Sequence, residues 1–286
     1  MFRSSEDAQE EQEHTSQLLE QAMDVVQSPI WSAIQRWNGR LNPMLKNWWR
    51  DGWSQILGRP TRVTVGTMFS CSDLAFHVMT KLALAARAAI GLQGAKSVFQ
   101  LVFECEIDEE RQEWLCEQFP DCEILFKDAS QLNNPRAECV KAGDYIAVPA
   151  VEVLLAGPMC SDRTPANRQS AGAKGCVQAA KGRTGSTFGY ALDYVRAKRP
   201  QLVIMENVKE LHESGVVGND ADWVVSKFEE MRYQAKHTTM QAREYGSFPK
   251  LLRMYFIAYD NDVRGECPFL TDTVTTMVED LYASYG

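Results

Sequence analysis

The sequence predicts an α/β fold: a doubly wound, mostly parallel sheet with an antiparallel edge hairpin and an N-terminal helical extension. From residue 63 onward, short apolar runs alternate with helical patterns, which is typical of a parallel sheet covered by helices on both faces. The runs are apolar at consecutive positions, as expected for strands buried on both faces. The last two expected strands are close enough in sequence to pair at one edge of the sheet.

Residues 1–58 are expected to form a separate extension, and residues 59–286 the α/β domain. Seven of the first 25 residues are Asp or Glu, so the extension begins with an acidic segment. Five tryptophans follow between residues 31 and 53, interspersed with basic residues. This pattern favours the buried face of helices, and the alternative is a surface that stacks bases or contacts phosphates.

Each element of the α/β domain has its own local signal. Strands are expected where apolar and β-branched residues cluster, and helices where apolar residues recur at helical spacing. In chain order the sequence predicts strand Val63–Met68, helix Leu74–Ile90, strand Val98–Glu104, helix Glu109–Gln118, strands Glu123–Phe126 and Val151–Ala156, helix Ser186–Lys198, strand Leu202–Met205, helix Ala221–Tyr233, and strands Lys236–Arg243 and Met254–Tyr259.

The composition excludes several classes of protein. With 24% charged and 45% hydrophobic residues, the chain has the composition of a soluble globular protein, and no run approaches the roughly 18 apolar residues of a membrane span. The first residues lack the apolar segment of a signal peptide, so an intracellular location, nuclear or cytoplasmic, is expected rather than secretion. Eight cysteines without a CxxC pair and only four histidines predict no metal site.

The charge distribution is uneven. A formal net charge of −8 argues against a uniformly basic nucleic-acid-binding protein. Between Arg163 and Arg199, however, there are eight Lys or Arg residues and one acid, Asp193. A basic collar next to Cys160 would suit a phosphate-bearing substrate, and the alternative is a solvated loop whose charge is balanced elsewhere.

Two expected strands lead directly into reactive side chains. Gly157-Pro158-Met159-Cys160 follows one, and Glu206-Asn207-Val208 follows another. In an open α/β sheet the carboxyl ends of the strands meet at one crevice, so the thiol and the carboxylate could lie together. A thiolate beside a protonated carboxyl is what covalent attack on an electron-poor heteroaromatic ring requires. The alternatives are a buried, inert thiol and a salt-bridged acid.

The turn after the first strand lies where such folds bind a nucleotide-like cofactor. It runs Phe69-Ser70-Cys71-Ser72-Asp73-Leu74 and contains no glycine, which weakens the signal and disfavours a dinucleotide-binding oxidoreductase. The second strand ends near Glu106, whose carboxylate could accept hydrogen bonds from ribose hydroxyls. The third ends near Asp128, which could accept a hydrogen bond from an adenine amino group.

In their shared order, these motifs resemble the cytosine-C5 DNA methyltransferase family. The resemblance runs from about Val63 to Tyr259 and includes Ala166-Asn167-Arg168 and the segment from Gln241 through Arg253. It implies that Cys160 adds to C6 of a flipped-out cytosine, that Glu206 holds N3, and that Asn207 positions the cysteine loop. The resemblance also implies that S-adenosyl-L-methionine binds to Phe69, Ser70, Cys71, Glu106, Ile107, Asp128 and Pro158. It further implies that the base or its neighbouring phosphates contact Arg163, Arg168 and Arg253.

Several positions depart from the family pattern. Cys71, Asp73 and Leu74 replace glycines, Met159 replaces a proline, and only 27 residues follow Tyr259, too few for a target-recognition domain. A partner protein is therefore expected to supply recognition, with DNA expected ahead of RNA as the substrate. Two alternatives remain: a catalytically inactive binding or scaffold subunit with the same fold, and a tRNA cytosine methyltransferase.

Overall fold

The computed structural model describes residues 61–89, 98–163, 175–212, 214–215, 218–241 and 252–264. The predicted N-terminal extension with its tryptophan-rich helices lies outside these residues, and so does Arg168. The proposed boundary between residues 58 and 59 therefore stays a prediction. None of the helices among the described residues is long and apolar enough to cross a membrane.

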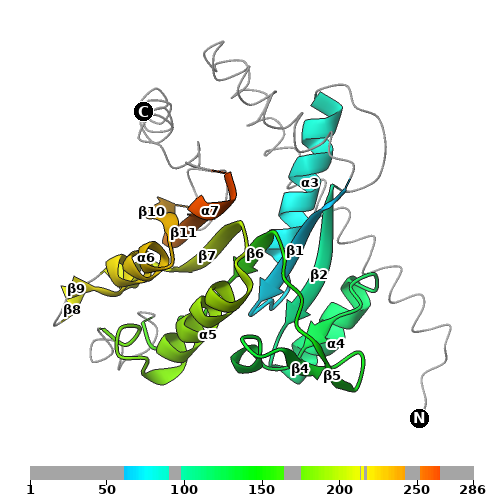
Figure 1. Cartoon of the computed structure of the whole chain (residues 1–286), viewed down its shortest axis with the longest axis horizontal. Coiled ribbons are helices and arrows are strands. Elements are labelled where there is room, and N and C mark those ends of the chain that lie inside the picture. The colour runs from blue at the N-terminus through cyan, green and yellow to red at the C-terminus, as the bar shows by residue number, and fades with distance from the viewer. Residues whose placement is uncertain are drawn as a thin grey trace.

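The centre of the structure is a nine-stranded sheet in the order β10-β11-β7-β6-β1-β2-β3-β4-β5. Five of the strands, β3, β2, β1, β6 and β7, run parallel to one another, and β11 lies antiparallel between β7 and β10. Figure 1 shows β10 and β11 at one side of the sheet and β4 and β5 at the other. The strands are β1 (Val63–Met68), β2 (Phe99–Cys105), β3 (Leu125–Phe126), β4 (Arg136–Cys139), β5 (Asp144–Ala147), β6 (Val153–Ala156), β7 (Leu202–Val208), β10 (Tyr233–Gln241) and β11 (Leu252–Asp260). The predicted fold class, with its antiparallel edge hairpin, is confirmed.

Helices cover both faces of this sheet. They are α3 (Leu74–Ala89), α4 (Glu109–Gln118), α5 (Gly182–Lys198), α6 (Asp220–Glu230) and α7 (Asn261–Arg264), with short 3-10 helices η1 (Ala129–Gln131) and η3 (Lys209–His212) and a small hairpin of β8 (Ser214–Gly215) and β9 (Gly218–Asn219). Leu154 and Ala156 of β6 belong to the same buried cluster as residues of α5 and α6, whereas Val153 and Leu155 pack with α3. This alternation follows from the two-residue period of a strand.

The chain reverses its direction of progress across the sheet between β1 and β6. From β1 it proceeds to β2 and β3 on one side, and it then returns to β6 and β7 on the other. In open α/β sheets, ligands bind in the crevice outside the carboxyl ends of the strands at this switch point. The residues that follow β1, β2, β6 and β7 are therefore the candidates for a functional site.

The structure differs from the sequence prediction in two informative places. Strand β7 continues to Val208 instead of ending at Met205, because β11 pairs with it from Tyr259↔Leu202 to Arg253↔Val208. Glu206 and Asn207 thus lie within the strand rather than after it. The hairpin of β4 and β5 was not predicted, since its strands are short, largely polar and half exposed.

Candidate active site

The turn after β1 has a glycine-type backbone although it has no glycine. Phe69, Cys71 and Asp73 have positive φ values of 59°, 52° and 46°. A left-handed conformation costs a residue with a side chain about 1–2 kcal/mol, so the turn must be held by its contacts. The Thr67 hydroxyl donates to Asp73 Oδ2 at 2.9 Å, and the Ser70 N–H donates to the Cys105 carbonyl oxygen at 3.1 Å.

Asp73 is turned into the sheet, where its carboxyl forms a buried acid pair with Glu104 of β2. Burial raises the pKa of the Asp73 carboxyl to about 6. Burial, followed by the negative charge of Asp73, raises the pKa of Glu104 to about 8. Two neighbouring buried carboxyls resist being ionised together, so this pair favours holding a proton near neutral pH. Because Asp73 points inward, its side chain does not crowd the crevice outside the turn.

Glu106 fastens this turn to the end of β2. Its carboxylate accepts backbone N–H groups from Cys71 at 2.9 Å, Ile107 at 2.9 Å and Asp108 at 3.1 Å. These three bonds take up most of the acceptor capacity of a buried carboxylate. Asp128, at the corresponding place after β3, caps η1 by accepting the Ser130 N–H at 2.8 Å. The expected contacts of both acids with a cofactor stay predictions.

Two large apolar side chains are exposed after the ends of β1 and β2. Ile107, after β2, is 67% exposed, and Leu74, at the start of α3, is 62% exposed. Among the described residues only Tyr145 is a comparably exposed large hydrophobic residue. An apolar surface next to strand-end carboxylates suits a ligand that combines a planar base with a ribose, because such sites are mostly apolar with a few placed polar groups.

The loop that carries Cys160 is fixed to the first turns of α5. The Met159 N–H donates to the Thr187 hydroxyl at 2.9 Å, and the Asp162 N–H donates to the Thr184 hydroxyl at 3.1 Å. In return, the Thr184 N–H donates to the Asp162 carboxylate at 2.8 Å. Cys160 lies between these anchors and is partly exposed, as a nucleophile must be.

Asn207 joins β7 to the same loop. Its side-chain Nδ2 donates to the Pro158 carbonyl oxygen at 2.7 Å, and its Oδ1 accepts the Val208 N–H at 2.9 Å. The side chain is buried, so both bonds are shielded from water. They are the contacts that a loop-positioning role requires.

Glu206 precedes Asn207 and faces a cationic partner on β11. Arg253 Nε lies 2.8 Å from Glu206 Oε1, and both side chains are partly exposed. Burial raises the pKa of the Glu206 carboxyl above its usual value, whereas the Arg253 charge opposes this shift. A carboxyl with a raised pKa is suited to giving a proton to a substrate atom near neutral pH.

Arg163 lies inside the molecule, where only 2% of it is exposed. Its guanidinium donates to the Glu210 carbonyl oxygen of η3, and its Nε lies 3.9 Å from Oδ2 of the buried Asp220. The Arg163 N–H also donates to the Cys160 carbonyl oxygen at 2.9 Å. Arg163 thus anchors the end of the cysteine loop to η3 and α6. Its expected contact with a substrate stays a prediction.

Comparison with known proteins agrees with this geometry. Residues 82–282 match the protein family described as C-5 cytosine-specific DNA methylase. The chain belongs to this family. The match begins within α3, so it leaves out β1 and the glycine-free turn of this methylase-family chain.

Two curated relatives of this methylase-family chain are much longer than the matched region. The DNA (cytosine-5-)-methyltransferase DMT5 of Cryptococcus neoformans var. grubii is 31% identical over 207 residues, which are 71% of this chain and 8% of that protein. The type II methyltransferase M.Bsp6I of a Bacillus species is 29% identical over 117 residues, which are 40% of this chain and 34% of that protein. The chain therefore spans well under half the length of either relative.

Solved structures give weaker similarities. A putative DNA modification methyltransferase encoded within an E. coli prophage has a TM-score of 0.46 at 18% identity, covering 72% of this chain and 49% of that one. The S. pombe Dnmt2 methyltransferase has a TM-score of 0.47 at 15% identity, covering 72% of this chain and 52% of that one.

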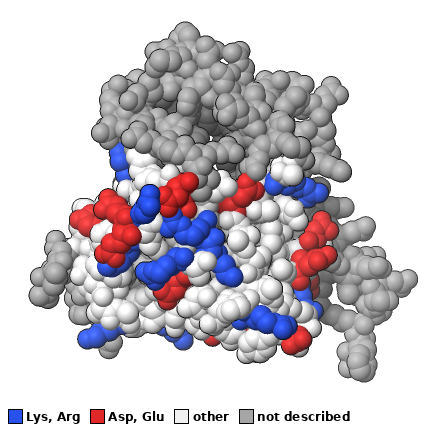
Figure 2. All heavy atoms as spheres, viewed as in Figure 1, with Lys and Arg blue, Asp and Glu red and all other residues white. Residues whose placement is uncertain are grey.

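Acids balance three of the six described Lys or Arg residues in the basic stretch of this methylase-family chain. Besides Arg163 near Asp220, Arg196 pairs with Asp193 at 2.8 Å and Arg199 with Asp260 at 2.7 Å. Figure 2 shows basic and acidic side chains interspersed on one face of the molecule. This arrangement favours the alternative of locally balanced charge over a continuous basic collar.

Three contributors to the site were not predicted from the sequence. Thr184 and Thr187 fix the cysteine loop, and Glu104 forms the acid pair with Asp73. Thr187 lies at the start of the predicted helix Ser186–Lys198, and Thr184 precedes that predicted start because α5 already begins at Gly182. A glutamate at the end of a largely apolar predicted strand was a visible signal for Glu104, because a buried acid requires a partner.

Proposed function

We propose that this chain carries the catalytic site for transfer of a methyl group to C5 of cytosine in DNA, with S-adenosyl-L-methionine as the methyl donor. The observation that carries the proposal is the hydrogen bond from Asn207 to Pro158, which sets the end of β7 beside the Cys160 loop. A thiol and a carboxyl with a raised pKa are then supplied by neighbouring parallel strands. Family membership and the names of the curated relatives support the reaction class.

Cys160 would act as the nucleophile and Glu206 as the acid. The thiolate forms a bond to C6 of a cytosine that has left its helix, and the ring electrons move toward C5 and N3. Glu206 holds N3 by a hydrogen bond and stabilises the charge that addition creates. Once C5 has gained the methyl group, loss of the C5 proton and departure of the thiolate restore the aromatic ring. Arg253 keeps the Glu206 carboxyl in place through their ion pair.

The residues around the switch point fit the proposed cofactor. Phe69, Ile107, Asp128 and Pro158 would hold S-adenosyl-L-methionine, together with Ser70 and Cys71 in the turn. Glu106 would do so with the acceptor capacity that its three backbone hydrogen bonds leave. Bound there, the cofactor supplies an electrophilic methyl group on a sulfonium. The inward Asp73 leaves space outside the turn, and the exposed Ile107 offers an apolar surface for a planar base.

Recognition of the nucleic acid is proposed to come from outside the described residues. The chain spans a small share of its curated relatives, and three of the six basic residues described between Arg163 and Arg199 are paired with acids. A partner protein that supplies target recognition therefore belongs to the proposal. An intracellular location, nuclear or cytoplasmic, stays a prediction.

Covalent trapping tests the proposal directly. DNA and tRNA oligonucleotides that contain 5-fluorocytosine should form a denaturation-resistant adduct with the parent chain in the presence of S-adenosyl-L-methionine, because fluorine at C5 blocks the final elimination. The adduct should be lost in Cys160→Ser and kept in Cys116→Ser, a matched variant on α4. Trapping of DNA, and not of tRNA, would support DNA as the substrate.

Cofactor binding is the control for a negative result. Calorimetric titration with S-adenosylhomocysteine should show binding to the parent chain and weaker binding to Asp128→Ala. If the parent binds S-adenosylhomocysteine but yields no adduct even with single-stranded oligonucleotides at high concentration, which do not depend on a recognition partner, the assigned role of Cys160 is wrong. If it does not bind, the inactive scaffold becomes the better account.

A further inference from the structure

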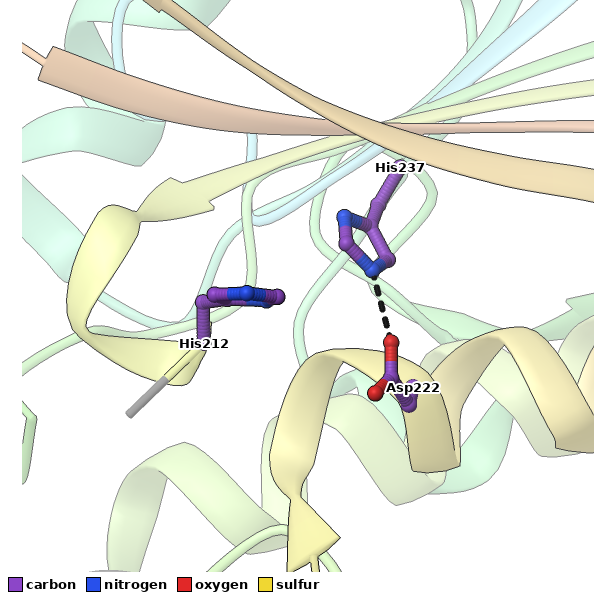
Figure 3. Close-up of side chains that lie close together, drawn as sticks. All are labelled: His212, Asp222 and His237. Carbon is purple, nitrogen blue, oxygen red and sulfur yellow. Dashed lines mark hydrogen bonds and ion pairs between the residues drawn. The ribbon is translucent and has the colours of Figure 1, made fainter. Parts of the chain in front are cut away.

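Away from the candidate active site, three side chains from three separate elements approach one another. His212 ends η3, Asp222 lies in the first turn of α6, and His237 lies on β10. One ligand atom from each lies within 4.8 Å of the other two. Figure 3 shows that the two imidazoles and the carboxylate border a common space.

One pair in this cluster is a direct contact, whereas the third member needs another explanation. His237 Nε2 lies 2.9 Å from Asp222 Oδ1. The ring centroids of His212 and His237 are 5.4 Å apart, with the planes tilted by 60°. The contact between His237 and Asp222 involves only one of the two imidazoles, and the second imidazole lies beside the same pair. Two neutral imidazoles and one carboxylate are a common ligand set for divalent transition metals.

We propose that His212, Asp222 and His237 form a binding site for a divalent transition-metal ion of the Zn²⁺ type. In a tetrahedral zinc site the ligand atoms lie about 3.3 Å apart, so an adjustment of side-chain torsions brings these three into range. The ion takes the position of the Nε2 proton of His237, and the ring then carries its proton on Nδ1. The exposed side chains of His212 and Asp222 leave the fourth position open to water.

Neighbouring groups already orient two of the three ligands. Asp222 Oδ2 accepts a hydrogen bond from Asn219 Nδ2 at 2.7 Å, which fixes the carboxylate at the start of α6. The His237 ring meets the Phe256 ring edge-on, with centroids 6.1 Å apart. The hydrogen bond with His237, more than any other contact, lowers the pKa of the Asp222 carboxyl, and the nearby His212 acts in the same direction. Such supporting contacts are typical of metal sites.

The position of the site gives it a structural role. The 3-10 helix η3 begins directly after β7, and its Glu210 carbonyl oxygen accepts the hydrogen bond from Arg163. An ion shared by His212, Asp222 and His237 would therefore clamp η3 to α6 and β10. It would stabilise the support on which the cysteine loop rests, without itself contacting a substrate.

Titration of the parent chain with ZnCl2 by calorimetry, and with CoCl2 by visible absorption, tests the site. We expect one ion to bind, and we expect the affinity to fall by at least about tenfold in His212→Ala, His237→Ala and Asp222→Asn, because even loss of an outer contact costs metal sites that much. His77→Gln, which removes a histidine of α3, is the matched control and should bind as the parent does. His212→Cys should keep the site and add a thiolate-to-cobalt absorption band.

The ligand variants are needed because cysteine thiols could also bind the added metal ion. The described residues include seven free cysteines, of which Cys71 is exposed, so an ion could also bind to sulfur. Equal affinity in the parent and in all three ligand variants would place the ion there and overturn the proposal. Absence of binding to the parent would overturn it as well. Circular dichroism and S-adenosylhomocysteine titration of each variant show that it is folded, and neither readout depends on methyl transfer.

Discussion

The side-chain amide of Asn207 reaches the carbonyl oxygen of Pro158 at 2.7 Å, so the interior of β7 is bonded to the loop that follows β6. The same side chain accepts the N–H of its neighbour Val208. Through these two bonds a single buried residue sets the distance between a strand that carries a carboxyl and a loop that carries a thiol.

Replacing Asn207 with Ala should impair methyl transfer more than cofactor binding. The Pro158 carbonyl and the Val208 N–H lose their partner in a buried place, so the free energy of unfolding should fall by about 1–3 kcal/mol. Urea denaturation measures this loss, and single-turnover transfer measures the misplaced loop. Asn219→Ala, which removes the cap of α6, should cost about 1 kcal/mol and leave transfer intact. Equal effects of the two variants on transfer would contradict the positioning role.

Replacing Glu104 with Gln should change how stability depends on pH. The pKa of Glu104 is raised to about 8 in the folded chain, so the folded state holds a proton that the unfolded state releases above about 4.5. Stability is then fully present at acid pH and is lost as the pH rises toward 8, at up to about 1.4 kcal/mol per pH unit for one proton. The glutamine variant should remove this loss. Urea denaturation at pH 5 to 9 checks it, with Glu229→Gln, an exposed acid of α6, as the control.

Replacing Cys71 with Gly should stabilise the chain slightly. Glycine removes the cost of the left-handed conformation, which is about 1–2 kcal/mol for a residue with a side chain. The greater freedom of glycine in the unfolded chain lowers the free energy of unfolding by about 0.5–1 kcal/mol, so a small net stabilisation remains. Cys71→Ala keeps the backbone cost and should be close to neutral. Thermal unfolding of the three proteins separates the two contributions. A glycine variant no more stable than the alanine variant would show that the turn is not strained at Cys71.

Replacing Arg163 with Met should destabilise the chain strongly. Asp220 would remain buried without its cation, and loss of one partner from a buried pair costs about 3–5 kcal/mol. The double variant Arg163→Met with Asp220→Asn should recover part of the loss, because no buried charge then remains. Denaturant unfolding of the single and double variants forms the test. Strictly additive losses would rule out the pairing.

Much of the fold was predictable because its signals are local. The bounds of β1 and α4 follow from an apolar run and from a helix that begins after Asp108, which accepts the Arg111 N–H as its cap. The end of β7 was not predictable, since its last residues are polar and pair only because β11 arrives from 45 to 57 residues away. Tertiary pairing overrode the local pattern there.

The candidate active site could be predicted from local signals, whereas the proposed metal site could not. Cys160, Glu206 and Asn207 were predicted as neighbours because the carboxyl ends of parallel strands meet, and the Asn207–Pro158 bond connects β7 to the loop that carries Cys160. The His212, Asp222 and His237 cluster was not predicted. Its members come from three elements, with no spacing that a helix or a strand would impose. Only the packing of η3, α6 and β10 brings them together.

The place of β11 in the sheet bears on how the chain is made. β11 lies between β7 and β10, although it is the last strand of the sheet to leave the ribosome. Until residue 260 has emerged, β7 presents an unpaired edge and β10 has no neighbour in the sheet, and such edges invite pairing with other chains. Nascent chains that stop before residue 252 should therefore require a chaperone, whereas those that extend past α7 can close the sheet by themselves.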